Sequence, residues 1–280
     1  MATRRVFLSQ TSAAFLTGSL MGSGLAPIAG ALRHARAAAE PSVPDGLQVI
    51  GEAEVVQVRD GDTVRLSTGQ DIRLVGIQAP KTHKPLAGYP AWPHSQEARE
   101  ALVFKILNKN VRFAYAGARM DRHGRGLAHL VATDGTWIQG WMLAQGHARV
   151  YSFADNRAFV PEMLRLETQA RAANRGLWAL DIYRVRQATE DFGPIGFFHL
   201  VEGTITDVGQ VRGRIFLNFG EDWRTDFTGR IEPDTVRQFR SEWPAWDALV
   251  GRKLRLRGWV YTQRGLTLDI THPEQIEIIG

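Results

Sequence analysis

Apolar and polar positions alternate over several short segments after the N-terminal stretch, and this alternation predicts strands. The first three strands are expected at residues 54–58, 63–66 and 72–77. An Asp-Gly turn at 60–61 and a Thr-Gly turn at 68–69 separate them. The sequence therefore predicts a three-stranded meander at the start of the folded region.

Helical spacing of apolar residues replaces this alternation in three places. A helix is expected at 96–107, with Ser95 at the position of its N-cap, and others at 137–144 and 161–174. Two more strands are expected between the first two helices, at 111–115 and 127–131. Strands, a helix, two strands and two helices therefore follow one another along this part of the chain.

A second β-rich region follows a connector at 181–197. A short helix is expected near 233–240, before the fourth of six strands. The strands are expected at 200–208, 213–219, 224–230, 253–260, 265–270 and 275–279. This order suggests a second small β-barrel similar to the OB fold, by analogy of strand order alone.

The composition is that of a globular protein, since 44% of the 280 residues are hydrophobic and 22% are charged. This length allows one large domain or two small ones. The absence of cysteine excludes disulfides and thiolate metal sites. Basic residues exceed acidic ones by 17 to 12 within 48–180, whereas 181–280 holds 13 basic and 15 acidic residues. The first region is therefore the one suited to a polyanion.

The N-terminal segment has the features of an export signal. It begins Met-Ala-Thr-Arg-Arg-Val-Phe-Leu, continues with an apolar stretch at 13–31 and ends in small residues at 35–39. A basic start, an apolar middle and a small-residue exit are typical of secretory signals, and the paired arginines indicate the twin-arginine type. We therefore expect residues 1–39 to be removed, leaving a periplasmic or secreted protein without a stable membrane span.

Two polar motifs carry the candidate chemistry. Asp60 and Asp62 lie two residues apart, so their carboxylates face the same side of an extended strand and suit Ca²⁺ or Mg²⁺. The second motif is Asp-Arg-His-Gly-Arg-Gly at 121–126. Its Arg125 and the separate Arg73 supply planar guanidinium groups that suit phosphate. The motifs together contain the groups needed to bind a phosphodiester.

These motifs and the order of the elements resemble the staphylococcal nuclease, or thermonuclease, family. The resemblance covers about residues 49–180 and includes the Ala-Asn-Arg-Gly-Leu-Trp segment that ends at Trp178. It implies a mostly β (α+β) protein in which 48–180 forms an OB-fold barrel with packed helices. A second β-rich domain, OB-like by analogy, is expected at 198–280.

The resemblance also implies roles for individual residues. Asp62, with Asp60 beside it, matches a metal ligand of the family. Arg73 and Arg125 match the two arginines that bind the phosphate during catalysis. The remaining candidates are expected to contact nucleic acid: Arg122, His123, Tyr151 and Phe153.

At two positions the sequence departs from the family pattern. Gln78 stands where the family has a metal-ligating aspartate, so its amide oxygen could coordinate a cation but brings no charge. Lys81 stands where the family has the glutamate that acts as general base, and a protonated lysine cannot accept a proton from water. We therefore expect a catalytic centre that includes Lys81, binds phosphate well and holds Ca²⁺ or Mg²⁺ only weakly.

Three functions remain open from the sequence. The protein could be an active phosphodiesterase on nucleic acid, without sequence specificity, in which Lys81 replaces the charge of the metal or is kept neutral by the nearby Arg73 and Arg125. Asp60 or a histidine would then accept the proton, and the candidate histidines are His83, His94 and His123. Alternatively, catalysis is lost and a module that binds nucleic acid or another anion remains. The third possibility is a cell-envelope scaffold with exposed tryptophans at 92, 243 and 246.

Overall fold

The computed structural model describes residues 41–280 except 87, 191, 193, 194 and 223. The export signal expected at 1–39 therefore lies outside the described residues. All the contacts discussed below lie within the unit that spans Ala39–Gly280.

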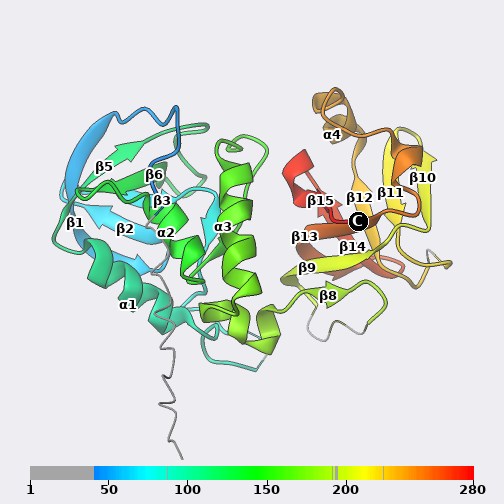
Figure 1. The fold of residues 1–280 in the computed structure, drawn as a ribbon, viewed down its shortest axis with the longest axis horizontal. Coiled ribbons are helices and arrows are strands. Elements are labelled where there is room, and N and C mark those ends of the chain that lie inside the picture. The colour runs from blue at the N-terminus through cyan, green and yellow to red at the C-terminus, as the bar shows by residue number, and fades with distance from the viewer. Residues whose placement is uncertain (1–40, 87, 191, 193–194, 223) are drawn as a thin grey trace, which may run out of the picture. The chain divides into compact units, whose positions relative to one another are not determined.

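The first barrel closes through five strands in the order β1-β2-β3-β6-β5 (Figure 1). The strands are β1 (Gly51–Asp60), β2 (Thr63–Leu66), β3 (Asp71–Leu74), β5 (Asn110–Ala114) and β6 (Gly126–Ala132). Neighbouring strands are antiparallel except β3 and β6, which are parallel. The predicted OB-like barrel is therefore confirmed.

Three helices pack on this barrel: α1 (Ser95–Ile106), α2 (Ile138–Ala144) and α3 (Val160–Ala172). Their bounds lie within two residues of those expected. Ser95 is the first residue of α1, because His94 holds the cap position with a left-handed backbone (φ 68°) and makes no side-chain cap hydrogen bond. The predicted capping role of Ser95 is therefore wrong.

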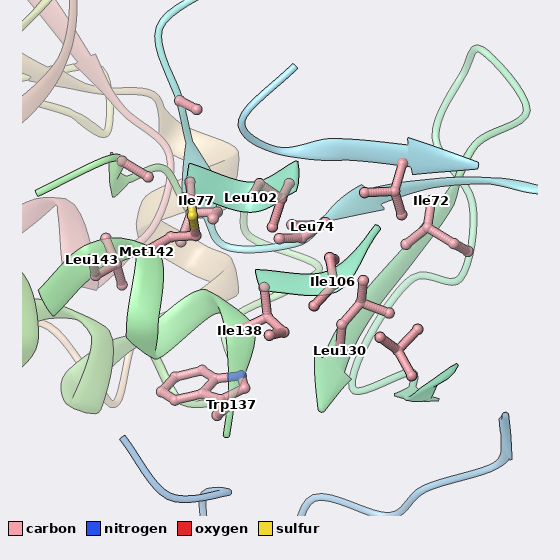
Figure 2. Packing of buried hydrophobic residues seen from close by; sticks show 14 of the residues in the cluster. Ile72, Leu74, Ile77, Leu102, Ile106, Leu130, Trp137, Ile138, Met142 and Leu143 are labelled. Carbon is pink, nitrogen blue, oxygen red and sulfur yellow. The ribbon is translucent and has the colours of Figure 1, made fainter. Parts of the chain in front are cut away.

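The alternation of the strands puts their apolar side chains inside the barrel. Ile72, Leu74 and Leu130 are fully buried and belong to one core cluster with Leu102 and Ile106 of α1 (Figure 2). The apolar face of α1 therefore closes the barrel from outside. The same face of α1 also packs against the turn between β1 and β2, at Gly61.

The expected strand 72–77 is interrupted, because β3 ends at Leu74 and a turn at 75–76 follows, and two short strands of the first region were not expected as separate elements. They are β4 (Ile77–Gln78) and β7 (Arg149–Val150), which pair antiparallel and put Gln78 opposite Arg149. A strand this short shows no periodicity of its own, so only the folded chain reveals it. This pairing decides the orientation of one predicted site residue.

The second region forms a curled sheet with one α-helix, α4 (Pro233–Gln238). Its strands are β8 (Arg186–Gln187), β9 (Phe197–Thr204), β10 (Asp207–Val211), β11 (Arg214–Asn218), β12 (Thr228–Ile231), β13 (Lys253–Thr262), β14 (Leu266–Ile270) and β15 (Ile276–Ile278). Short 3-10 helices complete the chain: η1 (Gly176–Ala179), η2 (Asp181–Tyr183), η3 (Trp246–Leu249) and η4 (Pro273–Gln275).

The strand order of the second sheet matches that of the first barrel. The path runs β10-β11-β12-β14-β13-β9, with β12 and β14 parallel. Only Ile205 and Thr206 separate β9 from β10, so the two are halves of one bent strand that pairs with β13 on one side and β11 on the other. Since α4 precedes β13 as α1 precedes β5, the second sheet has OB-like order.

Two predicted strands of this region need correction. The expected strand 200–208 is two strands, because the chain bends after Thr204. The expected strand 224–230 begins only at Thr228. The preceding residues form a hydrogen-bonded turn, in which the Asp222 amide donates to the Asp226 carboxylate at 2.9 Å. This local side-chain hydrogen bond competes with strand pairing.

The two regions share a small hydrophobic cluster. Trp178 at the end of the first region packs with Phe197, Phe198 and Leu200 of β9. Buried ions reinforce the contact, since Arg257 Nη2 of β13 lies 2.9 Å from the carboxylate of Glu167 in α3. The expected connector is therefore packed, with Tyr183 buried in the same cluster.

The tryptophans considered for a scaffold role are covered to different degrees. Trp92 is buried, and Trp243 and Trp246 are partly buried against the second core. Within the described residues, no helix is long and apolar enough to cross a membrane.

Candidate functional site

Asp60 and Asp62 lie where β1 turns into β2, and both are buried. Gly61 between them is pressed against the neighbouring chain. A Cβ on Gly61 would lie 2.7 Å from Cβ of Ala79 and 3.0 Å from Cβ of Ala98 in α1. A side chain at this position would therefore push the turn away from α1, so glycine keeps both carboxylates directed toward residues 79–81.

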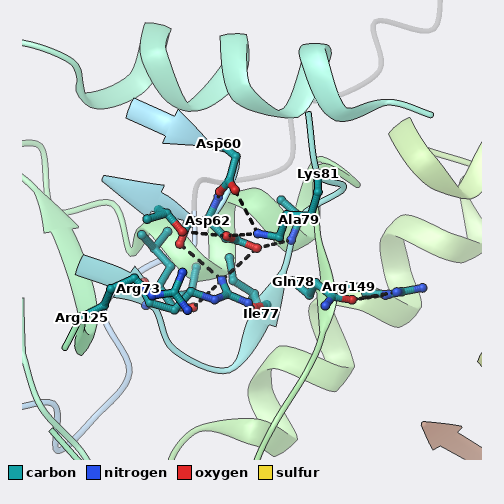
Figure 3. Close-up of polar contacts among 12 residues, drawn as sticks. Asp60, Asp62, Arg73, Ile77, Gln78, Ala79, Lys81, Arg125 and Arg149 are labelled. Atoms are coloured by element: carbon teal, nitrogen blue, oxygen red, sulfur yellow. Dashed lines mark hydrogen bonds and ion pairs between the residues drawn. The ribbon is translucent and has the colours of Figure 1, made fainter. Parts of the chain in front are cut away.

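The ammonium group of Lys81 lies between the two carboxylates (Figure 3). Its Nζ is 3.2 Å from Oδ2 of Asp60 and 2.5 Å from Oδ1 of Asp62. Only 12% of the Lys81 side chain is exposed. The positive charge of Lys81 therefore bridges the two carboxylates. A bound metal cation would need the same carboxylate oxygens as ligands.

The second carboxylate oxygen of Asp62 also has two bonding partners. Oδ2 accepts a hydrogen bond from the amide of Ala79 at 2.7 Å and lies 2.8 Å from Nη1 of Arg73. Arg73 in turn donates through Nη2 to the carbonyl oxygen of Ile77 at 2.7 Å. Asp62 therefore ties β3 and the following segment to the turn after β1.

The four charges Asp60, Asp62, Arg73 and Lys81 sum to zero, but the two carboxyl groups differ. Burial and the nearby Asp62 raise the pKa of Asp60, and Lys81 only partly opposes this. Burial alone would raise the pKa of Asp62 too, but Arg73 and Lys81 outweigh it and hold the pKa well below its ordinary value. Asp62 is therefore the permanent anion of the site.

Arg125 lies on the same sheet face as Arg73. Ile72 is opposite Gly126 in the parallel β3–β6 pair, and Arg73 and Arg125 are their direct neighbours along the chain. Because successive side chains alternate between the two faces of a sheet, both arginines point to the face opposite Ile72. Arg125 is held by Asp121, whose Oδ2 is 2.6 Å from Nη2. The structure therefore brings the two predicted phosphate-binding arginines to one face, each with a carboxylate partner.

Gln78 points away from the acidic pair, as Figure 3 shows. Its Oε1 accepts hydrogen bonds from Nε and Nη2 of Arg149 at 3.1 and 2.7 Å. Arg149 is 3% exposed, and burial lowers its pKa to about 10. Its Nη1 donates to the carbonyl oxygen of Phe198 at 3.0 Å. The structure thus uses Gln78 to hold a buried arginine and does not bring it to Asp60 and Asp62.

The remaining predicted residues lie in two loops. Arg122 and His123 are exposed and hydrogen-bond to each other, and the His123 amide donates to Asp121. Tyr151 and Phe153 follow β7, and their ring centres are 4.8 Å apart. Asn156, in the same loop as the aromatic pair, donates to the carbonyl of residue 118, which joins this loop to the chain leading to Asp121.

The second sheet completes an aromatic hollow around Tyr151 and Phe153. Trp259 Nε1 of β13 donates to the hydroxyl of Tyr151 at 3.1 Å, and the ring of Phe198 is 5.4 Å from that of Tyr151. The hollow has a volume of about 310 Å³, and Tyr261 also lines it. Sequence reasoning missed these partners because they lie far along the chain in a region without a recognised motif.

None of the candidate histidines lies at the acidic pair. His94 Nε2 is 3.0 Å from Nδ1 of His147, with which it stacks. His123 bonds to Arg122, and within the described parts of the chain neither it nor His83 is hydrogen-bonded to Asp60 or Asp62. A histidine base for the reaction therefore has no support in these contacts.

The donor set does not suit a divalent cation. Such a cation needs several oxygen ligands, of which carboxylates are the strongest. Here the Lys81 ammonium and the Ala79 amide already bind the oxygens of Asp62, and Gln78 faces Arg149. No group of three or more His, Cys, Asp or Glu side chains in the described residues is arranged to hold a metal ion.

Comparison with known proteins matches residues 71–180 to the family of staphylococcal nuclease homologues. A probable staphylococcal-like nuclease, CAN1, from Oryza sativa subsp. japonica is 36% identical over 150 residues, which is 52% of this chain and 40% of the rice protein. An uncharacterized endonuclease from Escherichia coli O157:H7 is 34% identical over 128 residues, covering 45% of this chain and 75% of the bacterial protein.

A third relative is an uncharacterized Bacillus anthracis protein, pXO1-141, which is 29% identical over 140 residues. These residues are 48% of this chain and 64% of the Bacillus protein. The chain therefore spans less than two thirds of the rice and Bacillus relatives.

Proposed function

Because this chain belongs to the family of staphylococcal nuclease homologues, we propose that its first barrel binds the phosphodiester backbone of nucleic acid without metal-dependent hydrolysis. One observation carries the proposal: the Lys81 ammonium bridges Asp60 and Asp62. A built-in cation bonded to both carboxylates takes the place that a divalent ion would need. The protein would then keep the binding surface of a nuclease while lacking its metal chemistry.

Loss of the base supports the same conclusion. Residue 81 carries an ammonium group, which donates protons in hydrogen bonds and cannot accept one. Asp62 is held as an anion by Arg73 and Lys81, so it is a poor proton acceptor. Asp60 has a raised pKa but is 4% exposed and bonded to Lys81. An attacking water would therefore lack an accessible base.

A group of charged residues on β1, β2 and β3 and just before β6 supports phosphate binding. Arg65 is opposite Asp71 in the β2–β3 pair, and its Nε lies 2.8 Å from the Asp71 carboxylate. Arg59 Nη2 contacts the same carboxylate at 2.9 Å, and Arg125 is close enough to lower its pKa. With Asp121, which pairs with Arg125, the three guanidinium groups have two carboxylates beside them, so a net charge of about +1 remains, which suits a polyanion.

The aromatic hollow gives the bases of a nucleic acid a place to stack. Phe153 is 49% exposed and Trp259 is 39% exposed, although both are large apolar side chains. Stacking on aromatic rings tolerates any base and stabilises binding by about 1–3 kcal/mol per base. We therefore propose that the protein contacts the backbone through arginines of the first barrel and the bases through Tyr151 and Phe153 and through Trp259 of the second sheet, without sequence specificity.

A combined binding and cleavage assay tests this function. The full chain is incubated with labelled single-stranded DNA and RNA, in Ca²⁺, in Mg²⁺ and in EDTA. We expect binding that weakens as salt increases, with intact nucleic acid in all three conditions. Arg125→Ala should weaken binding, whereas Arg165→Ala, which removes an exposed arginine of α3, should not.

Three outcomes would contradict the proposal. Cleavage that EDTA abolishes would mean that a metal ion displaces Lys81. Cleavage that persists in EDTA and is lost in Lys81→Met would favour an active site in which the ammonium replaces the metal. Absence of any nucleic-acid binding at low salt would leave the scaffold role as the better account.

We also propose that the protein is exported, because paired Arg4 and Arg5 precede an apolar stretch and a small-residue exit. Cell fractionation tests this directly. The full chain should be recovered outside the cytoplasm in shortened form, and the Arg4→Lys/Arg5→Lys variant should remain inside at full length. Identical fractionation of the two proteins would rule out the twin-arginine route.

A further inference from the structure

A groove of about 540 Å³ lies on the second sheet, over β10, β11, β12 and the start of β14. The alternate residues of these strands, including Ile215, Leu217 and Ile231, are buried in the second core. The residues that line the groove therefore belong to the outer face of the sheet. None of them takes part in the site described above.

Strand register arranges the groove floor in two rows across the four strands. The first row is Gly209, Phe216, Arg230 and Asp269. The second row is Asp207, Asn218, Thr228 and Thr267. An aromatic ring thus lies in the middle of a polar surface whose side chains both donate and accept hydrogen bonds.

Phe216 is the apolar centre of this surface. It is half-buried, and its β10 neighbour Gly209 adds no side chain opposite the ring. The guanidinium carbon of Arg214 lies 5.9 Å from the ring centre. Two neighbouring planar groups, one aromatic and one guanidinium, form a surface on which an unstacked base can lie.

Arginines occupy the two hairpin turns next to the groove. Arg212 lies between β10 and β11, and Arg264 lies between β13 and β14. Both adopt a left-handed backbone, with φ of 51° and 60°, and each is followed by a glycine. In OB-like order these turns are the first-to-second and fourth-to-fifth strand loops, which bind oligonucleotides in OB folds together with the second and third strands.

The charges of the groove are mixed but positive in sum. Arg214, Arg230, Arg264 and Asp207 line the groove, and Arg212, Glu232 and Asp269 lie next to these residues. The carboxylates are bonded within the groove, Glu232 to Arg214, Asp269 to Arg230 and Asp207 to Asn218. Four arginines and three carboxylates leave a net charge of about +1, and two of these arginines, Arg212 and Arg264, lie in the turns at the edges of the groove.

We propose that this groove is a second binding site for single-stranded nucleic acid, with a base on Phe216 and phosphates at Arg212 and Arg264. The choice of nucleic acid over a neutral oligosaccharide rests on the function proposed for the first barrel. A single strand is favoured because its bases are free to stack on a protein ring. Two sites on one chain would raise the affinity for strands long enough to reach both.

Binding of a labelled oligothymidylate to the full chain tests the inference. Phe216→Leu keeps an apolar side chain but removes the ring, and we expect about tenfold weaker binding. Phe216→Tyr should restore it. Arg212→Ala/Arg264→Ala should reduce the slope of log affinity against log salt by about 1.4, since each phosphate contact of a single strand contributes about 0.7. Arg240→Ala, an exposed arginine after α4, is the matched control and should change neither quantity.

The first-barrel variant Arg125→Ala separates the two proposals. If Arg125→Ala weakens binding and the groove variants do not, the second site is overturned and the first stands. If only the groove variants weaken binding, the second site stands and the proposed role of the first barrel fails. Loss of binding to a chito-oligosaccharide in Phe216→Leu, with oligothymidylate binding unchanged, would also overturn the inference in favour of a sugar site. The turn variants keep the test valid if Phe216→Leu does not fold.

Discussion

At the scale of single residues, Lys81 decides the chemistry of the candidate site. Its ammonium bonds to two buried carboxylates that would otherwise repel each other, and it neutralises half of their charge. Arg73 completes the neutralisation from β3. The same acidic turn that could contribute to a metal site thus becomes an internal ion-pair cluster, because one position carries a cation in place of an anion.

Lys81→Glu should reverse this arrangement. The variant would have three carboxylates around one space, which is destabilising without a cation and favourable for Ca²⁺. We expect Ca²⁺ to raise the melting temperature of the variant and to give a calorimetric binding signal, with neither effect in the wild type. Gln78 needs no change, because it faces Arg149.

Lys84→Glu is the matched control, since it makes the same charge change at an exposed position three residues away. It should bind Ca²⁺ no better than the wild type. If Lys81→Glu also showed no Ca²⁺ effect, the carboxylates at 60 and 62 would not be arranged around residue 81 as described.

At the scale of elements, the short β4–β7 pair links the candidate site to the second sheet. β4 leaves the site with Ile77, whose carbonyl oxygen binds Arg73, and continues to Gln78, whose side chain binds Arg149. Arg149 then reaches the backbone of Phe198 in β9. Its guanidinium carbon is 4.4 Å from the ring centre of Phe198, a distance at which cation–π attraction helps hold a buried charge.

Gln78→Ala should therefore destabilise the fold through Arg149. The substitution removes the acceptor of two guanidinium hydrogen bonds and leaves Nε and Nη2 of a buried cation without that partner, which costs about 2 kcal/mol. The free energy of unfolding in urea measures this loss. Gln96→Ala removes a glutamine from the exposed surface of α1 and should change stability by less than about 0.5 kcal/mol.

A double-mutant cycle identifies the partner. Arg149→Met removes the cation, so adding Gln78→Ala to Arg149→Met should cost clearly less than Gln78→Ala alone. Equal costs in the two backgrounds would show that Gln78 stabilises the protein through some other contact.

At the scale of the whole molecule, buried or partly buried neutral histidines occur in both regions. Burial lowers the pKa to about 4 for His129 in β6, His147 after α2 and His272 after β14. His272 joins the two regions, because its Nε2 is 2.7 Å from the hydroxyl oxygen of Ser152. Protonation of these groups is therefore coupled to unfolding.

The direction of the pH effect follows from these pKa values. The unfolded chain takes up protons near pH 6.5, whereas the folded histidines remain neutral down to about pH 4. Stability is therefore full above about pH 6.5 and falls as the pH decreases toward 4, by up to about 1.4 kcal/mol per pH unit for each histidine.

Urea unfolding between these pH values measures the slope. His272→Gln should reduce the slope, and His123→Gln, which changes an exposed histidine, should leave it unchanged. A flat stability profile over this interval would show that the three histidines are protonated in the folded protein.

The sequence by itself determined most of the barrel and predicted which residues would form the candidate site. Strands such as β2 and β6 were predictable because alternation and turn residues act over a few neighbouring positions. The presence of Asp62, Arg73 and Arg125 in recognisable motifs was equally local. The bend between β9 and β10 and the two-residue strands were not predictable, because nothing in their immediate neighbours specifies them.

Only the tertiary structure decided what the site residues do. Lys81 lies 19 residues from Asp62 in the sequence, Arg149 lies 71 from Gln78, and Trp259 lies 108 from Tyr151. Each pair meets because separate elements fold against one another. The residue types alone indicated a phosphate-binding site. Ion pairs and hydrogen bonds, however, form between residues that are close in space, so only the folded chain showed that the carboxylates of Asp60 and Asp62 are already bonded to other side chains.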